Sequence, residues 1–223
     1  MNIIDLKNIT KTYNEGKSNQ VKALINVNLQ IEQGDTLTIM GVSGSGKSTL
    51  LHIVGCLDNA TSGEYTFNGT DISNFNSTEL ATFRNESIGF ILQDDMFMMN
   101  ESVFENVKLP LIFSKKYPIK AMNQRVLDVL AEIGIANLFK RKVKQLSGGQ
   151  RQRVAIARAI VNAPEVILAD EPTGSLDSKT ATEIMDVLLS LNKSGKTIIM
   201  VTHDVNMAKK LGKIVNIVDG TIC

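Results

Sequence analysis

Short apolar segments separated by turn residues fill the first third of the chain. Residues 3–6, 24–31 and 37–40 are rich in apolar side chains and are bounded by Asn, Gly and Asp residues, which predicts strands. Over residues 48–57 the apolar positions take the spacing of a helical face, and strand character returns at residues 65–67. This part of the chain therefore predicts strands around one helix.

The middle of the chain has the periodicity of amphipathic helices. Helices are predicted at residues 77–84, 121–133 and 147–161. Residues 94–144 do not alternate between strand and helix patterns, so we expect this segment to be a helical insertion.

Strands and a helix alternate in the last part. Residues 166–169, 197–201 and 214–218 are short continuous apolar runs, which are typical of strands buried on both faces. An amphipathic helix is predicted at residues 179–191, between the first two of these strands. This order predicts a parallel sheet with crossover connections, and hence an α/β fold.

Composition narrows the function classes. Hydrophobic residues make up 43% of the 223 positions, which supports a sizeable core and argues against disorder. The net charge of +1 argues against a broad basic face, and we expect no nucleic-acid partner. The two cysteines form no metal or disulfide framework, which favours a reducing cytosol. No signal peptide is visible, and the longest apolar runs fall far below the ~20 residues that span a bilayer.

A glycine-rich segment carries the clearest chemistry. Residues 41–48 read Gly-Val-Ser-Gly-Ser-Gly-Lys-Ser and lie between a predicted strand and a predicted helix, the context of a phosphate-binding loop. The glycines let backbone N–H groups turn toward a phosphate, Lys47 adds a point charge, and the Ser48 hydroxyl can bind Mg²⁺. An ordinary Gly/Ser turn would match by chance on the order of 1% of the time. We expect a nucleotide to bind at Gly41, Ser43, Gly44, Ser45, Gly46, Lys47, Ser48 and Thr49.

Three polar residues follow two of the other predicted strands. Asp170 and Glu171 end the run at residues 166–169, and His203 follows the run at residues 197–201. Parallel strands deliver such residues to the carboxyl edge of the sheet, where α/β folds bind ligands. Alone, an Asp-Glu pair is more often a solvated turn and a lone His a surface residue. Beside a phosphate loop, we expect Asp170 to hold Mg²⁺, Glu171 to polarise the attacking water and His203 to contact the γ-phosphate.

The segment Leu-Ser-Gly-Gly-Gln at residues 146–150 opens the helix predicted at 147–161. Ser147 and Gln150 alone would form an S-x-x-Q capping box. Two glycines in the first turn cost about 1 kcal/mol each relative to alanine, and a cap does not need them. A helix start that a phosphate must approach does need them.

This segment is also the signature of ABC ATPases, and nearly the whole chain resembles their nucleotide-binding subunits. The resemblance implies a P-loop NTPase fold of ABC type. Its mainly parallel core sheet carries an N-terminal antiparallel β subdomain and a helical insertion subdomain. It also implies one ATP-binding domain over residues 1–223, with the core and β subdomain at about 1–93 and 162–223 and the helical part at about 94–161.

The resemblance assigns further site residues. Tyr13 matches the aromatic that stacks on adenine, Gln93 the loop glutamine that senses γ-phosphate and Mg²⁺, and Asp177 belongs to the loop that crosses a dimer interface. The implied catalytic residues are Glu171, His203, Lys47 and Gln93, and the implied Mg²⁺ ligands are Ser48, Gln93 and Asp170. A second copy of the chain is expected to complete each ATP site with Ser147, Gly148, Gly149 and Gln150.

Local segments point to a subgroup. Leu57-Asp58, residues 61–65 and Leu109-Pro110-Leu111 resemble the subunits for macrolide export, lipoprotein release and resistance to antimicrobial peptides. The expected partner is an integral membrane permease, with this chain held on the cytoplasmic face of the membrane. The alternative is a non-transport ABC ATPase of the cell-division type that regulates a membrane protein. DNA-repair relatives are disfavoured because no heptad insertion is present.

Two surface features have open interpretations. Met96, Met98 and Met99 fit either an adaptable partner surface or core packing. The basic cluster at residues 140–144 fits either lipid headgroups or a solvated face.

Overall fold

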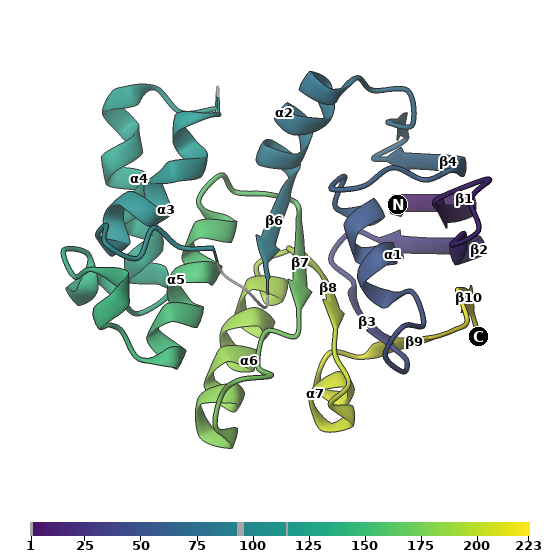
Figure 1. Ribbon diagram of the computed structural model, residues 1–223. Coiled ribbons are helices and arrows are strands. Elements are labelled where there is room, and N and C mark those ends of the chain that lie inside the picture. The colour runs from purple at the N-terminus through teal and green to yellow at the C-terminus, as the bar shows by residue number, and fades with distance from the viewer. Residues whose placement is uncertain (1, 93–95, 115) are drawn as a thin grey trace.

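Two β-sheets form the framework of the computed structural model (Figure 1), which describes residues 2–92, 96–114 and 116–223. The first sheet is antiparallel, with strand order β2-β1-β4-β5. Its strands are β1 (Asn2–Tyr13), β2 (Val21–Glu32), β4 (Ser62–Phe67) and β5 (Thr70–Asp71). The second sheet has the order β10-β9-β3-β8-β7-β6 and is parallel from β9 to β6, while β10 pairs antiparallel with β9. Its strands are β3 (Thr36–Met40), β6 (Ile88–Ile91), β7 (Val166–Asp170), β8 (Thr197–Val201), β9 (Lys213–Val218) and β10 (Thr221–Ile222).

The helices connect the parallel strands and form an insertion. The connecting helices are α1 (Lys47–Val54), α2 (Ser77–Ser87), α6 (Ser178–Lys193) and α7 (Val205–Lys210). Between β6 and β7 the chain forms α3 (Val103–Ile112), α4 (Ile119–Glu132), the short 3₁₀ helices η1 (Ala136–Leu138) and η2 (Val143–Gln145), and α5 (Gly148–Ile160). The α/β class, the parallel core, the antiparallel N-terminal sheet and the helical insertion are thus confirmed.

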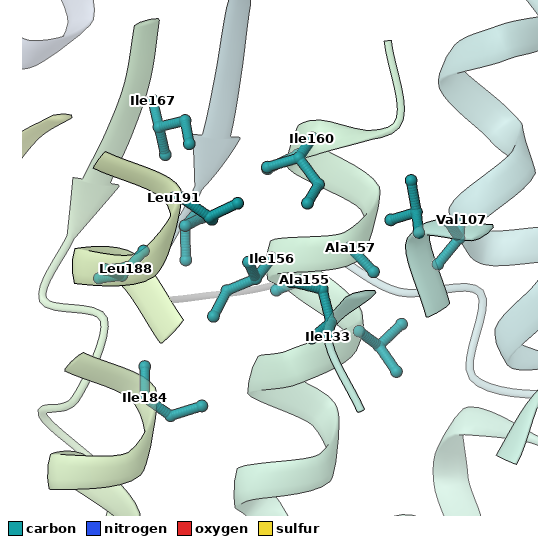
Figure 2. Close-up of a cluster of buried hydrophobic side chains, with 14 of the residues drawn as sticks. Val107, Ile133, Ala155, Ile156, Ala157, Ile160, Ile167, Ile184, Leu188 and Leu191 are labelled. Carbon is teal, nitrogen blue, oxygen red and sulfur yellow. The ribbon is translucent and has the colours of Figure 1, made fainter. Parts of the chain in front are cut away.

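The two faces of the parallel sheet are covered by different helices because side chains alternate along each strand. On β7, Val166 and Leu168 pack with the apolar side chains of α1. Ile167 and Ala169 point the other way and pack with α5 and α6. Figure 2 shows Ile156 and Ile160 of α5 beside Ile184, Leu188 and Leu191 of α6, with Ile167 of the sheet above them. The strands β7 and β8 are therefore buried on both faces, as their apolar sequences predict. The same prediction for residues 214–218 is wrong: in β9 only Ile217 is buried, and Ile214 and Val218 are exposed, because β9 is covered on one side only by the two-residue edge strand β10.

Two details differ from the sequence prediction. The helix expected to reach Leu57 ends at Val54, and Cys56 lies beyond it in a turn with a φ of 54°. The first strand continues to Tyr13, past the predicted end at Leu6, because bulges keep β1 paired with β2. The helical insertion expected at residues 94–144 contains α3, for which the sequence predicted no bounds; this helix includes Pro110 near its end.

The two thiols have opposite environments. Cys56 is buried, and this burial raises its pKa to about 12, whereas Cys223 is exposed. Because the thiolate is the reactive form, we expect one thiol to react with a disulfide reagent in the native protein and two after unfolding in guanidinium chloride. Measuring the absorbance of the released thiol checks this. A Cys223→Ser variant should release no thiol in the native state. Fast reaction of this variant in the native state contradicts the burial of Cys56.

The structure shows where the methionines at 96–99 and the basic cluster at 140–144 lie. Met96 is 83% exposed, and Met98 and Met99 are also exposed, which contradicts core packing. The basic residues of the cluster at 140–144 lie on the surface. Among the described residues, none of the helices has the combination of length and apolar character that crossing a bilayer requires.

Candidate nucleotide site

The phosphate loop (residues 41–48) joins β3 to α1 and has the backbone that only glycine adopts easily. Gly44 and Gly46 have φ values of 80° and 109°. The Ser45 N–H donates to the Val42 carbonyl at 3.2 Å, and Leu50 N–H donates to the Gly46 carbonyl at 2.9 Å. The loop thus curls directly into the N-terminus of α1, where N–H groups and the helix dipole favour an anion.

The loop is also wedged against the β2 strand and the β9–β10 hairpin. A Cβ atom added to Gly46 would lie 2.5 Å from the Ala23 carbonyl oxygen, and one added to Gly220 would lie 2.8 Å from the same atom. The Gly220 N–H donates to the Ser45 carbonyl at 2.9 Å. Two separate segments, β2 and the turn between β9 and β10, therefore hold the loop in place.

The residues of the loop fit a nucleotide polyphosphate. Beside the loop lies a cavity of about 530 Å³ that is lined by residues of β2, residues 43, 44 and 46–49, and the turn at 219–220. Lys47 Nζ donates to the carbonyls of Gly41 and Val42 at 2.9 and 2.7 Å, so it spans the loop. The buried Ser45 hydroxyl has no hydrogen-bond partner among the described residues. The site thus offers a cation and polar donors around a concave backbone.

The carboxylates lie at the neighbouring strand ends, as expected. Asp170 ends β7, and burial raises its pKa; the nearby Glu171 charge raises it further, whereas His52 and Lys47 lower it. Because β3, β8 and β7 are adjacent, Asp170 and the phosphate loop share one sheet edge. The Asp170 carboxylate and Ser48 hydroxyl are hard oxygen ligands that fit Mg²⁺. No group of three or more His, Cys, Asp or Glu residues suited to a metal occurs among the described residues.

Glu171 and His203 form a direct pair. Glu171 Oε1 lies 2.7 Å from His203 Nδ1 and accepts the His203 backbone N–H at 3.1 Å. Its other oxygen accepts the Thr202 hydroxyl at 3.0 Å. Glu171 has a φ of 46°, which is unusual for a residue with a side chain and is typical of functional sites. The structure therefore holds the Glu171 carboxylate in one orientation beside an imidazole that is 76% exposed.

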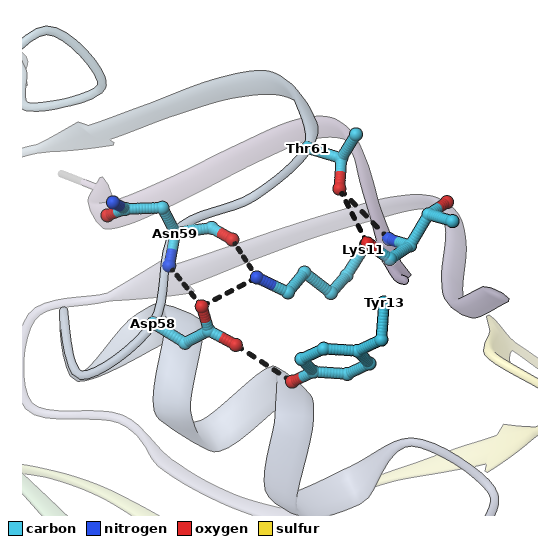
Figure 3. Close-up of polar contacts among 6 residues, drawn as sticks. Lys11, Tyr13, Asp58, Asn59 and Thr61 are labelled. Atoms are coloured by element: carbon cyan, nitrogen blue, oxygen red, sulfur yellow. Dashed lines mark hydrogen bonds and ion pairs between the residues drawn. The ribbon is translucent and has the colours of Figure 1, made fainter. Parts of the chain in front are cut away.

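Tyr13 is held by a polar network at the end of β1 (Figure 3). Its hydroxyl donates to Asp58 Oδ2 at 2.8 Å, and Lys11 Nζ donates to Asp58 Oδ1 at 2.6 Å. The same ammonium group lies 4.8 Å from the centre of the Tyr13 ring. Burial of Asp58 opposes its ionisation, but the hydrogen bonds from Lys11 and Tyr13 outweigh it and hold the pKa of Asp58 below its usual value. Partial burial and the bond to Asp58 raise the pKa of Tyr13. The ring is therefore fixed in place by a charged pair.

The signature segment lies on a different element. Ser147 caps α5: its hydroxyl accepts the Gln150 N–H at 3.3 Å, and the Gln150 side chain accepts the Ser147 N–H at 3.1 Å. The predicted capping box is thus present. The helix α5 packs on the face of the sheet opposite α1, and Figure 1 shows the two helices on either side of β7 and β8. The structure therefore brings the phosphate loop together with Asp170, Glu171 and His203 but leaves the signature apart from them.

Two other predicted site residues have separate outcomes. Asp177 caps α6, and its Oδ1 accepts the N–H groups of Lys179 and Thr180 at 3.1 and 3.0 Å. Gln93 lies outside the described residues.

Sequence reasoning missed several supporting residues. In the sequence, Asp58 stands out only as part of a family segment, although its carboxylate accepts a hydrogen bond from Tyr13, which lies 45 residues away in the chain. Thr202 and Ala23 carried no signal beyond their places at a strand end and within a strand. The adjacent letters Thr-His after a buried strand would have been a reason to examine Thr202.

Comparisons with known proteins agree with this geometry. Residues 24–174 match the family described as ABC transporter. The chain is 47% identical over 220 residues to the uncharacterized ABC transporter ATP-binding protein YvrO of Bacillus subtilis, with 99% of this chain and 95% of that protein covered. It is 47% identical over 221 residues to the lipoprotein-releasing system ATP-binding protein LolD of Pseudoalteromonas translucida, with 99% and 94% covered.

A longer relative and a solved structure add to this. The chain is 44% identical to the macrolide export ATP-binding/permease protein MacB of Nitrosomonas europaea; the match covers 99% of this chain and 33% of that protein. The ATP-binding cassette MJ0796, solved as a dimer in a post-hydrolysis state with ADP and Pi, is similar with a TM-score of 0.89 and 44% identity, covering 98% of this chain and 96% of that one.

Proposed function

This chain belongs to the ABC transporter family of ATP-binding proteins, and on that premise we propose that it is the ATPase subunit of a membrane transporter that works as a pair of copies. The observation that carries the proposal is that the predicted site residues of one chain lie in two separate places. The phosphate loop, Asp170, Glu171 and His203 share one sheet edge, whereas Ser147 lies at the start of a helix on the other face. One chain therefore supplies two separate halves of a phosphate site.

The residues of one edge have distinct roles in the proposed reaction. Lys47 and the N–H groups of the phosphate loop bind the β- and γ-phosphates of ATP. Ser48 and Asp170 hold Mg²⁺, with Gln93 as the proposed third protein ligand. When bound, Mg²⁺ neutralises charge on the phosphate oxygens. Glu171 accepts a hydrogen bond from the attacking water, and His203 orients Glu171 through the bond at 2.7 Å and contacts the γ-phosphate.

The second copy completes the site. The free N–H groups at the start of α5 and the Ser147 hydroxyl form an anion-binding helix end. Two chains facing each other would place this end, with Gly148, Gly149 and Gln150, against the γ-phosphate held by the partner, and Asp177 near the interface. The solved relative MJ0796 is a dimer, which supports this arrangement.

A membrane permease is the proposed second partner. A cavity of about 560 Å³ lies where α2, β6, α3 and α5 meet, and its lining includes Leu57, Phe90 and Phe113. Phe113 is 72% exposed, which is unusual for a large apolar side chain without a partner. We place the permease contact here and along the exposed Met96–Met99 segment, on the cytoplasmic face of the membrane. The relatives LolD and MacB are named for lipoprotein release and macrolide export, and we propose that this chain drives export or extrusion of a lipoprotein, drug or peptide.

The dependence of ATPase activity on protein concentration tests the proposal. Because two chains form each site, the rate of phosphate release per chain should rise with protein concentration before it levels off. Sedimentation at the same concentrations reports the monomer fraction. A rate per chain that stays constant where the protein is monomeric contradicts the shared site. Co-purification with a membrane protein tests the transport role, and Phe113→Asp should lower the yield of that complex while isolated ATPase activity is retained.

The network around Tyr13 gives a further prediction. We propose that adenine stacks on the Tyr13 ring, so Asp58→Asn should loosen the ring and raise the KM for ATP about fivefold, equivalent to about 1 kcal/mol, with kcat unchanged. Steady-state phosphate release measures both constants. Hydrolysis of inorganic triphosphate, which lacks the base, should not change. Asp128→Asn, at an exposed carboxylate on α4, is the matched control. An unchanged KM for ATP contradicts the role of Asp58.

A further inference from the structure

The first turn of α5 touches the first turn of α6 in the same chain. A Cβ atom added to Gly149 would lie 2.4 Å from the Cγ2 methyl of Thr180, closer than carbon atoms approach in proteins. A Cβ atom added to Gly148 would lie 3.4 Å from Leu176. Leu176 belongs to the interface loop (residues 175–177), which leads into α6. Both signature glycines therefore face this loop and the start of the helix after it.

Thr180 has little freedom to move away. Its hydroxyl donates to Asp177 Oδ2 at 2.7 Å, and its backbone N–H donates to Asp177 Oδ1 at 3.0 Å. Rotation about χ1 would carry the methyl away from Gly149 only by breaking the hydroxyl bond, and β-branched side chains in helices already have few rotamers. The methyl position is therefore fixed by Asp177.

We propose that Thr180 is a positioning residue that joins the signature to the interface loop within one chain. Its methyl imposes glycine at position 149, and its hydroxyl fixes the carboxylate of Asp177. The inference rests on the proposed function, in which both segments meet a second copy. The inference gives a different reason for glycine at position 149. The group that leaves no room for a side chain there is the Thr180 methyl of the same chain.

The helix propensity of alanine makes the prediction diagnostic. Gly149 is the second residue of α5, where alanine is the better helix former. If Thr180 did not lie against Gly149, the substitution Gly149→Ala should stabilise the protein. With Thr180, we expect Gly149→Ala to lower the Tm by about 4 °C. The double variant Gly149→Ala/Thr180→Ser lacks the methyl and keeps the hydroxyl, so its Tm should equal or exceed that of Thr180→Ser.

The dimer gives the second readout. All variants are placed on a Glu171→Gln background, and ATP-dependent dimerisation is measured by sedimentation. We expect Gly149→Ala to weaken dimerisation tenfold or more, Thr180→Ser to stay within twofold of its parent, and the double variant to recover at least threefold. Thr180→Val keeps the methyl and loses the bond to Asp177, so it should dimerise at least fivefold more weakly than Thr180→Ser. ATP binding to the monomer should be unchanged throughout.

The outcomes separate the hypotheses. Restored Tm without restored dimerisation in the double variant means that the nucleotide itself requires Gly149, and it overturns the inference. Equal dimerisation of Thr180→Val and Thr180→Ser also overturns it. If Gly149→Ala does not fold, recovery of folded, dimerising protein in the double variant supports it. A parent that stays monomeric with ATP overturns the proposed function and the inference with it.

Discussion

Replacement of Glu171 by glutamine is expected to lower the ATP turnover rate by about 10²–10⁴-fold, the usual scale for loss of a positioned acid–base group. Glutamine keeps the shape of the side chain, and its amide oxygen can still accept the His203 backbone N–H, although the NH2 group in place of the other oxygen can no longer accept the Thr202 hydroxyl. It lacks the negative charge that, in the proposed mechanism, polarises the attacking water. ATP binding should therefore be retained, and we expect an ATP-bound dimer to accumulate because the step that opens it is blocked.

Phosphate release and sedimentation with ATP measure the two effects of Glu171→Gln. The matched control is Glu64→Gln, an exposed glutamate on β4, which should behave like the parent. Parental turnover in Glu171→Gln means that another group activates the water.

Ser147→Arg is expected to weaken ATP-dependent dimerisation by about 10²-fold or more, because a long side chain replaces a small hydroxyl at the anion-binding start of α5. The nucleotide half-site on the phosphate loop lies on another element, so ATP binding to the monomer should remain within about twofold, far below one decade of affinity. Sedimentation measures the dimer, and a fluorescent ATP analogue measures binding to the monomer.

The matched control for Ser147→Arg places arginine at another helix start. Ser77 is the first residue of α2, where Asn76 provides the cap, and Ser77→Arg should dimerise normally. A normal dimer peak for Ser147→Arg means that the signature does not meet the second copy.

Periodicity in the sequence predicts the fold well where side chains have one role. The buried runs at β7 and β8 have apolar side chains on both faces, and the prediction matched their ends within one residue. The end of α1 was wrong because Leu57 extends the apolar pattern although Gly55 and Cys56 form a turn. In that turn the Leu57 and Asp58 N–H groups donate to the His52 carbonyl at 2.8 and 3.3 Å. The spacing of apolar residues therefore does not predict where a helix ends in a hydrogen-bonded turn.

The site is predicted from sequence only where residues are neighbours in the chain. The phosphate loop and the signature are each a continuous stretch of sequence, so each can be identified from its own residues. Asp58 beside Tyr13 and Thr180 beside Gly149 are contacts across 45 and 31 residues, and neither residue type is distinctive. Glu171 was assigned from its place after a strand, whereas its left-handed backbone comes only from the structure.

The close contacts of Ala23 and Gly220 with the phosphate loop affect how ATP binds. A loop that orders only around its ligand loses conformational entropy at that moment, and this loss weakens binding. Here the Ser45 carbonyl is already bonded to Gly220, and Gly46 already sits against Ala23. Capture of the polyphosphate should then resemble rigid docking, with an association rate governed by diffusion and charge and not by rearrangement of the chain.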